Sequence, residues 1–326
     1  MRVDVNGLNH RPKLFHVFEV TEGHIVACDT VVLLEEAVSS RNGFLDALVA
    51  VVAGFQGLAP DGRVSTLGRG GSDTSAVALA AALDADRCDI YTDVDGVYTT
   101  DPRIAPKAQK LDQITFEEML EMASLGAKVL QTRSVAMAMR HNVNLQVRSS
   151  FTDAPGTLVV NEDAIVEQEK ISGIAYSPDE AKVTIQGLPD KPGTAAAIFG
   201  ELSENHINVD MIVQSATGEG QGADITFSLG RGDLAKALEL INAGRDRLGF
   251  QDLVATENVT KISVVGMAMR SQPGVAGTMF ETLAERGINI EVISTSEIKI
   301  SVLIASEYTE LAVRSLHSAF GLDAED

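Results

Sequence analysis

Residues 65–83 read Ser-Thr-Leu-Gly-Arg-Gly-Gly-Ser-Asp-Thr-Ser followed by Ala-Val-Ala-Leu-Ala-Ala-Ala-Leu. A polar, glycine-rich turn that opens onto an alanine-rich apolar run is typical of a strand-to-helix junction. The exposed amide groups at such a helix N-terminus attract an anion. Arg69, in the middle of the turn, has a planar guanidinium that can bind a carboxylate or a phosphate through two hydrogen bonds.

The types of residue in this turn support the same interpretation. Glycine adopts backbone conformations that side chains forbid and lets the chain approach a ligand closely. Ser72, Asp73 and Thr74 are favoured N-cap residues. An ordinary loop that caps an ordinary helix would look similar, because lone glycine-rich motifs have many false positives. Only the rest of the sequence can distinguish a ligand-binding turn from an ordinary capping loop.

The chain around this turn alternates between predicted strands and helices. Ala47–Ala53 is a continuous apolar run typical of a buried parallel strand. Further strands are predicted at 87–92 and 144–149, and a helix at 72–83. Thr115 and Glu118 form a capping-box pattern at the start of another helix. We therefore expect an α/β unit with a mainly parallel sheet and helices on both faces over residues 45–160.

Composition sets the class of protein. The 326 residues suffice for two or three domains. The formal net charge of −20 argues against nucleic acid or an anionic membrane as a partner. No apolar run approaches the ~20 residues of a membrane helix. Two cysteines make no disulfide framework. We expect a cytoplasmic protein that binds neither nucleic acid nor membranes.

The C-terminal half contains an internal repeat. Lys182-Val-Thr-Ile-Gln-Gly-Leu-Pro-Asp-Lys-Pro-Gly193 is echoed by Lys261-Ile-Ser-Val-Val-Gly-Met-Ala-Met-Arg-Ser-Gln-Pro-Gly274. Each copy has the pattern strand, loop, helix, strand, strand, which fits a βαββαβ ferredoxin-like unit. The repeat predicts two modules, at 172–250 and 258–326, after a linker.

Several motifs resemble those of the aspartate kinase family. They are Thr66-Leu-Gly-Arg-Gly-Gly-Ser-Asp-Thr74, Tyr91-Thr-Asp-Val-Asp-Gly-Val-Tyr-Thr-Thr-Asp-Pro-Arg103, Gly126-Ala-Lys-Val-Leu130, Asp190-Lys-Pro-Gly193 and Asn208-Val-Asp-Met211. The resemblance implies part of an amino-acid-kinase fold followed by two ACT domains. It also implies transfer of the γ-phosphoryl group of ATP, with Mg²⁺, to the side-chain carboxylate of L-aspartate, towards lysine, threonine and methionine.

The resemblance assigns roles to residues in this sequence. Asp73 would be catalytic, by orienting the groups around the phosphate. The substrate residues would be Phe55, Arg69, Gly70, Gly71 and Ser72. The nucleotide residues would be Thr92, Asp93, Tyr98, Thr99, Thr100, Asp101, Pro102, Arg103 and Lys128. The residues that bind lysine or threonine as effector would be Asp190, Ala195, Asp210, Gln214, Asn289, Ile290, Ser296 and Glu297. No residues are assigned as metal ligands. Pairing of ACT domains implies a homodimer or a larger assembly.

The N-terminal part departs from the family. The family opens with a strand and Lys-Phe-Gly-Gly-Thr-Ser, which hold the ATP phosphates, and this motif does not occur here. Residues 1–44 do not match the family, and 67 residues precede Gly68 where the family has more than a hundred. Two hypotheses therefore stand. The chain is an aspartate kinase regulated through its ACT domains, or it is an inactive regulatory subunit or truncated fragment that binds an effector amino acid and associates with a complete kinase chain.

Overall fold

The computed structural model describes residues 24–28, 31–37, 47–126, 129–165, 171–216, 222–270 and 274–324. The chain divides into two compact units. The first consists of Met1–Thr99 and Gln109–Gln168, and the second of Thr100–Ala108 and Glu169–Asp326. The segment Thr100–Ala108 thus leaves the first unit and belongs to the second.

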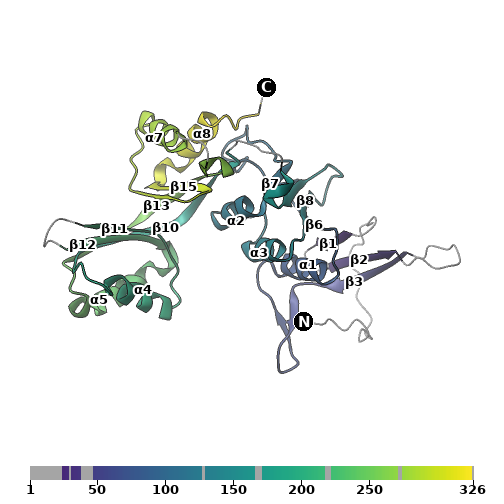
Figure 1. Cartoon of the computed structure of the whole chain (residues 1–326), viewed down its shortest axis with the longest axis horizontal. Helices are drawn as coiled ribbons and strands as arrows, with labels where there is room; N and C mark the ends of the chain where they lie inside the picture. The colour runs from purple at the N-terminus through teal and green to yellow at the C-terminus, as the bar shows by residue number, and fades with distance from the viewer. Residues whose placement is uncertain are drawn as a thin grey trace. The chain divides into compact units, whose positions relative to one another are not determined.

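Within the described residues, the first unit is built on a seven-stranded sheet with the order β3-β2-β1-β6-β8-β9-β7 (Figure 1). The strands are β1 His24–Cys28, β2 Val31–Ala37, β3 Ala47–Ala53, β6 Arg87–Thr92, β7 Gln113–Thr115, β8 Leu145–Ser149 and β9 Thr157–Val160. A separate two-stranded ribbon pairs β4 Gln56–Leu58 with β5 Val64–Thr66.

The sheet is mixed rather than mainly parallel. β6 runs parallel to β1 and to β8, and β7 runs parallel to β9. β2 pairs antiparallel with β1 and with β3, and β8 pairs antiparallel with β9. The prediction that Ala47–Ala53 is a parallel strand is therefore wrong. A continuous apolar run is typical of a buried strand, but it does not indicate whether the neighbouring strand runs parallel or antiparallel to it.

Strands β1 and β2 fall in the segment 1–44, for which the family motifs provide no match. They join the same sheet, and β1 lies between β2 and β6. The apolar run Val31-Val-Leu-Leu34 is part of β2.

Among the described residues, the α-helices that accompany this sheet are α1 Gly71–Ala82, α2 Phe116–Ser124 and α3 Thr132–His141. Helix α1 contacts β1 and β6, and α3 contacts both α1 and α2, as Figure 1 shows. The predicted capping box is confirmed. Thr115 Oγ1 accepts a hydrogen bond from the Glu118 amide, while the Glu118 carboxylate accepts one from the Thr115 amide. Phe116, Met119 and Met122 then form the buried side of α2.

The second unit contains a six-stranded antiparallel sheet, within the part of the chain that the structure describes, with the order β11-β12-β10-β13-β15-β14. Its strands are β10 Gly173–Leu188, β11 Val209–Ala216, β12 Ala223–Gly230, β13 Asp252–Val265, β14 Val292–Thr295 and β15 Lys299–Ala305. Its helices are α4 Thr194–Glu204, α5 Leu234–Ala243, α6 Arg245–Leu248, α7 Val275–Glu285 and α8 Thr309–Ala319.

The two long strands β10 and β13 are shared between two ferredoxin-like modules (Figure 1). Residues 182–186 of β10 pair with 252–256 of β13 in the first module, whereas 173–177 pair with 261–265 in the second. The fourth strand of the second module is therefore the start of β10, which precedes the first module in sequence. This exchange keeps the two modules in one sheet.

Each module has its own hydrophobic core. In the first, Phe227 is fully buried and meets Phe199 edge to face, with ring centroids 5.4 Å apart. In the second, Met279, Leu283 and Leu316 pack against β13 and β15. Aromatic pairs in this geometry add to the stabilisation from burial alone.

Candidate functional site

The glycine-rich turn forms the N-terminus of α1, as predicted. Its N-cap is Gly70, which has a left-handed backbone (φ 70°), and no side chain caps the helix. A Cβ atom added to Gly70 would lie 2.0 Å from Cγ of Gln131. Left-handed backbone disfavours side chains, and Gln131 leaves no room for one. The sequence therefore needs glycine here for two independent reasons.

The turn that follows β3 lies against the same helix start. Gly54 packs on Ser72, since a Cβ added to Gly54 would lie 3.5 Å from Cα of Ser72. Phe55 has a left-handed backbone (φ 65°) and its carbonyl accepts a hydrogen bond from the Leu67 amide at 2.9 Å. Phe55 is 39% exposed, and its ring borders Gly71. Phe55 and the glycine-rich turn, both predicted to bind the substrate, thus lie next to each other at the start of α1.

Arg133, at the start of α3, was not predicted. Its guanidinium donates hydrogen bonds of 2.6 Å to the carbonyls of Leu67 and Arg69. These bonds fix the backbone of the turn and leave the Arg69 side chain exposed. No local sequence signal marks Arg133, because its partners are main-chain atoms more than 60 residues away.

Asp73 is half-buried in the first turn of α1. Burial raises the pKa of the Cys88 thiol, and the negative charges of Asp89 and Asp73 raise it further. Cys88 is therefore a protonated core residue and not a nucleophile.

Asp89, beside Cys88 on β6, is also buried and is paired by two arginines. Arg87 Nε donates to it at 2.6 Å, and Arg148 lies 3.7 Å away. The Arg148 guanidinium also lies 5.5 Å from the centroid of the Tyr91 ring.

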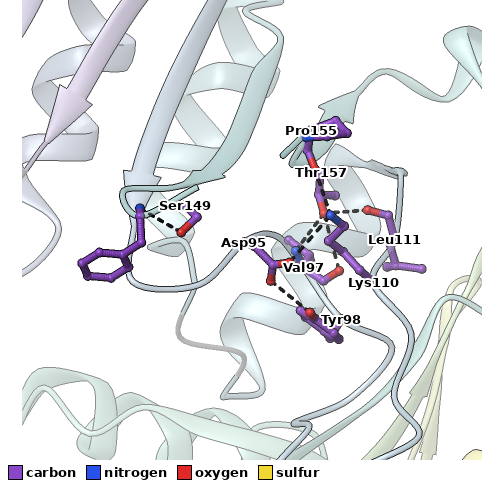
Figure 2. Close-up of polar contacts among 9 residues, drawn as sticks. Asp95, Val97, Tyr98, Lys110, Leu111, Ser149, Pro155 and Thr157 are labelled. Atoms are coloured by element: carbon purple, nitrogen blue, oxygen red, sulfur yellow. Dashed lines mark hydrogen bonds and ion pairs between the residues drawn. The ribbon is translucent and has the colours of Figure 1, made fainter. Parts of the chain in front are cut away.

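The loop after β6 carries the predicted nucleotide residues of the first unit. Thr92 Oγ1 donates to Asp93 at 3.1 Å, and the Thr92 carbonyl accepts the Ser150 amide, next to the end of β8. Tyr98 donates to Asp95 at 2.9 Å, as Figure 2 shows.

Thr157 holds the middle of this loop (Figure 2). Its hydroxyl accepts the Val97 amide at 2.8 Å and donates to the Leu111 carbonyl at 2.6 Å. Lys110 donates to the Pro155 carbonyl at 2.8 Å. Gly96 is needed because an added Cβ would lie 2.5 Å from Thr157 Oγ1. Thr157 was missed from the sequence because its partners lie about 50 residues away or more.

Thr99 and Gln109, which flank the segment 100–108, are joined by two hydrogen bonds. The Thr99 amide donates to the Gln109 carbonyl at 2.9 Å, and the Thr99 hydroxyl accepts the Gln109 amide at 3.0 Å. Beyond it, the predicted nucleotide residues Thr100, Asp101, Pro102 and Arg103 belong to the second unit. The Arg103 guanidinium, hydrogen-bonded to Asp101, lowers the pKa of that carboxyl. Lys128 lies outside the described residues.

A cavity of about 360 Å³ lies at the loop before α4 in the second unit. Three of the predicted effector residues, Asp190, Ala195 and Gln214, line it. Gly193 forms the N-cap of α4 with a left-handed backbone (φ 98°). A carboxylate beside a helix N-terminus can bind the ammonium group of an amino acid while backbone amides bind its carboxylate.

Asp210 does not line that cavity. Its carboxylate accepts a hydrogen bond from Lys261 at 2.8 Å. Burial opposes the charge on Asp210, but the hydrogen bond from Lys261 and its positive charge outweigh it, so the pKa of Asp210 is lowered.

The predicted effector residues of the second module surround β14. Ile290 lines a second cavity of about 350 Å³, together with Glu291 and Val213. Ser296 Oγ accepts the Lys299 amide in the turn that follows β14, and Asn289 and Glu297 are exposed. The structure therefore places Ile290 at a cavity, whereas Asn289, Ser296 and Glu297 lie in the segments on either side of β14.

The described residues contain no group of three or more His, Cys, Asp or Glu side chains placed to hold a metal ion. No helix among them has the length and apolar content needed to cross a membrane.

The chain matches three family models. Residues 29–149 match the amino acid kinase family, and residues 182–243 and 262–320 each match the ACT domain. The first match begins within the segment 1–44 and includes β2.

Curated relatives match over most of the chain. Aspartokinase of Pseudomonas aeruginosa is 56% identical over 278 residues, which are 85% of this chain and 67% of that protein. Aspartokinase of Mycolicibacterium smegmatis is 50% identical over 88% of this chain and 69% of that protein. The chain thus spans about two thirds of the length of these relatives.

Solved structures agree with this match. E. coli aspartokinase III in complex with aspartate and ADP matches with a TM-score of 0.71 and 33% identity, over 82% of this chain and 60% of that one. Aspartate kinase of Clostridium acetobutylicum has the same fold, with a TM-score of 0.73 at 24% identity, over 62% of its own length. Together with the glycine-rich turn and the paired ACT modules, these matches show that the chain belongs to the aspartate kinase family.

Proposed function

We propose that this protein is an aspartate kinase that transfers a phosphoryl group from ATP to the side-chain carboxylate of L-aspartate. The product is 4-phospho-L-aspartate, in the biosynthesis of lysine, threonine and methionine in the cytoplasm. The observation that carries the proposal is the turn at the N-terminus of α1. There the backbone at Gly71 meets Phe55 and the backbone at Gly70 meets Gln131, while the Arg69 side chain is exposed.

The substrate roles follow from the chemistry of these groups. The Arg69 guanidinium binds a carboxylate of aspartate through two hydrogen bonds. Ser72 offers a hydroxyl at the same helix end, and the helix dipole favours a bound anion there. Arg133 keeps the turn in position by binding the carbonyls of Leu67 and Arg69. Asp73 orients the reacting groups.

The nucleotide would be bound by polar residues of the loop that follows β6. Those residues are Thr92, Asp93, Tyr98, Thr99, Asp101 and Arg103. Bound ATP supplies the phosphoryl group, and Mg²⁺ neutralises the phosphate charge. Single carboxylates such as Asp73 are appropriate donors, since Mg²⁺ is usually held by one or two carboxylates together with substrate phosphates.

A coupled assay of the purified chain with ATP, Mg²⁺ and L-aspartate tests the proposal. Arg69→Ala should raise KM for aspartate about tenfold or more, because a hydrogen-bonded charge pair is lost. Arg63→Ala is the matched control, since Arg63 is an exposed arginine nearby whose guanidinium pairs with Asp61 in the ribbon turn. An equal loss in both variants would refute the role of Arg69.

A second candidate function is a regulatory chain that binds an effector and associates with a complete kinase. The cavity lined by Asp190, Ala195 and Gln214 favours it, because an amino-acid site can work without the kinase reaction. If the wild-type chain shows no turnover but lysine or threonine raises its melting temperature, this candidate replaces the first. Asp190→Asn should then abolish the rise in melting temperature. The control variant Asp246→Asn, on helix α6, should keep it.

Both candidates include assembly through the ACT modules. Strands β11 and β14 end the sheet in the described residues, and Ile212 and Ile293 on them are 51% and 43% exposed. Exposed strand edges with apolar side chains pair readily with another chain. Light scattering should show a homodimer or a larger assembly, and Ile212→Lys should shift it towards the monomer.

A further inference from the structure

The segment Thr100–Ala108 is held in the second unit by contacts from three separate parts of the chain. Ile104 packs against the hydrophobic core of the second module. The Tyr176 hydroxyl on β10 donates to Asp101 at 3.4 Å. The C-terminal residues form the third contact, and it is made by the backbone.

The C-terminal contact is a short piece of antiparallel pairing. Asp323 forms an isolated bridge with Ala108, and the Ala324 amide donates to the Lys107 carbonyl at 2.8 Å. Backbone pairing of this kind fixes the register of a segment independently of its side chains.

The side chain of Asp323 is anchored in turn by α8. One carboxylate oxygen lies 2.8 Å from Nδ1 of His317, and the other accepts a hydrogen bond of 2.7 Å from Ser318 Oγ. His317 is fully buried, so this anchor belongs to the core of the module. Hydrogen bonds from Ser318 and His317 lower the pKa of Asp323, and Lys107 contributes through its charge.

The segment has few means of holding its own shape. Its internal backbone hydrogen bonds are turns, in which Ile104 and Ala105 donate to the Asp101 carbonyl and Ala108 donates to Ala105. A segment of this kind needs outside contacts to offset the entropy of ordering it. The hydroxyl of Thr100 is buried and has no hydrogen-bond partner among the described residues, so this part of the segment gains no side-chain hydrogen bond there.

We propose that Asp323 is a positioning residue for nucleotide binding. Held by His317 and Ser318, it pairs the C-terminal residues with Lys107 and Ala108 and thereby fixes the segment that carries Asp101 and Arg103. The C-terminal end of the second ACT module thus sets the affinity of the chain for ATP or ADP. This inference rests on the proposed nucleotide-binding role of the segment.

The test compares Asp323→Ala with Asp252→Ala in the full chain. Asp252 is the matched control, because it is an exposed aspartate of the same unit whose carboxylate accepts a hydrogen bond from the amide of Leu253. Hydrogen exchange measured by mass spectrometry reports the segment directly. In Asp323→Ala, peptides covering 100–108 should exchange about five-fold faster or more, while peptides covering 181–188 of β10 should not change.

Calorimetric titration with Mg·ADP gives the second measurement. Asp323→Ala should weaken binding about five-fold or more, and Asp252→Ala should leave it unchanged. Ser318→Ala removes one of the two anchors and should give a smaller effect in the same direction. Because Ser318 is an exposed residue at the end of α8, this variant keeps the test valid if Asp323→Ala folds poorly.

The outcomes separate the two proposals. If residues 100–108 exchange at the wild-type rate in both Asp323→Ala and Ser318→Ala, the anchoring role is refuted. Faster exchange with unchanged ADP affinity would show that the anchored segment does not set nucleotide affinity and would overturn the inference. A wild-type chain that binds no ADP would refute the nucleotide role and the coupling with it, while the exchange data would still show whether Asp323 holds the segment.

Discussion

Replacing Lys261 with methionine should destabilise the region where the two ACT modules join. Lys261 is 6% exposed on β13, and its Nζ lies 2.9 Å from the Glu180 carboxylate and 2.8 Å from that of Asp210. Glu180 is 7% exposed on β10, near the bulge at which that strand passes from one module to the other. Lys261 therefore neutralises a buried charge at the junction.

The magnitude follows from the two partners. Glu180 would be left as a buried carboxylate without its cation, and removal of one member of a buried ion pair costs about 3–5 kcal/mol. Asp210 is half-exposed and adds little, because solvent screens its charge. A loss of about 3 kcal/mol corresponds to more than a hundredfold change in a local opening equilibrium.

Hydrogen exchange of peptides from β10 and β13 measures this loss at the junction itself. The matched control is Lys236→Met, since Lys236 is exposed and donates a hydrogen bond to the Asn205 carbonyl. That variant should cost less than about 1 kcal/mol. The double variant Lys261→Met/Glu180→Gln should recover most of the loss, because it removes the uncompensated charge. If Lys261→Met matches the control, or the double variant is no more stable than the single, the reasoning is refuted.

Three further predictions concern the two units. Gly70→Ala should destabilise the first unit by about 1–2 kcal/mol and should weaken aspartate binding, because the added methyl group meets Gln131; urea unfolding and KM measure the two effects. Phe227→Ala should cost the second unit about 3–5 kcal/mol in thermal unfolding, since the side chain is fully buried. The lowered pKa of Asp210 means that its contribution to stability is complete above about pH 4 and is lost as the pH falls through the folded-state pKa. An acid titration followed by circular dichroism should therefore be flatter for Asp210→Asn, and an identical curve would contradict the role of its bond to Lys261.

Local sequence patterns predicted several elements well. The helix expected at 72–83 is α1, one residue away at each end, and the strand expected at 87–92 is β6. The capping box at Thr115 and Glu118 starts α2 as expected. These features depend on residues within a few positions of one another, so the local chemistry is sufficient to specify them.

The sequence by itself also determined the repeat, the family and the glycines of the turn before α1. Only the tertiary structure decided that β3 runs antiparallel to β2, that the start of β10 completes the second module, and that Thr100–Ala108 belongs to the second unit. It also revealed Arg133 and Asp323, whose partners are backbone groups distant in sequence. The physical reason is the same in each case. Strand pairing and main-chain hydrogen bonds between distant segments depend on which segments meet when the core forms, and backbone groups are alike at almost every residue, so the sequence pattern carries no mark of the partner.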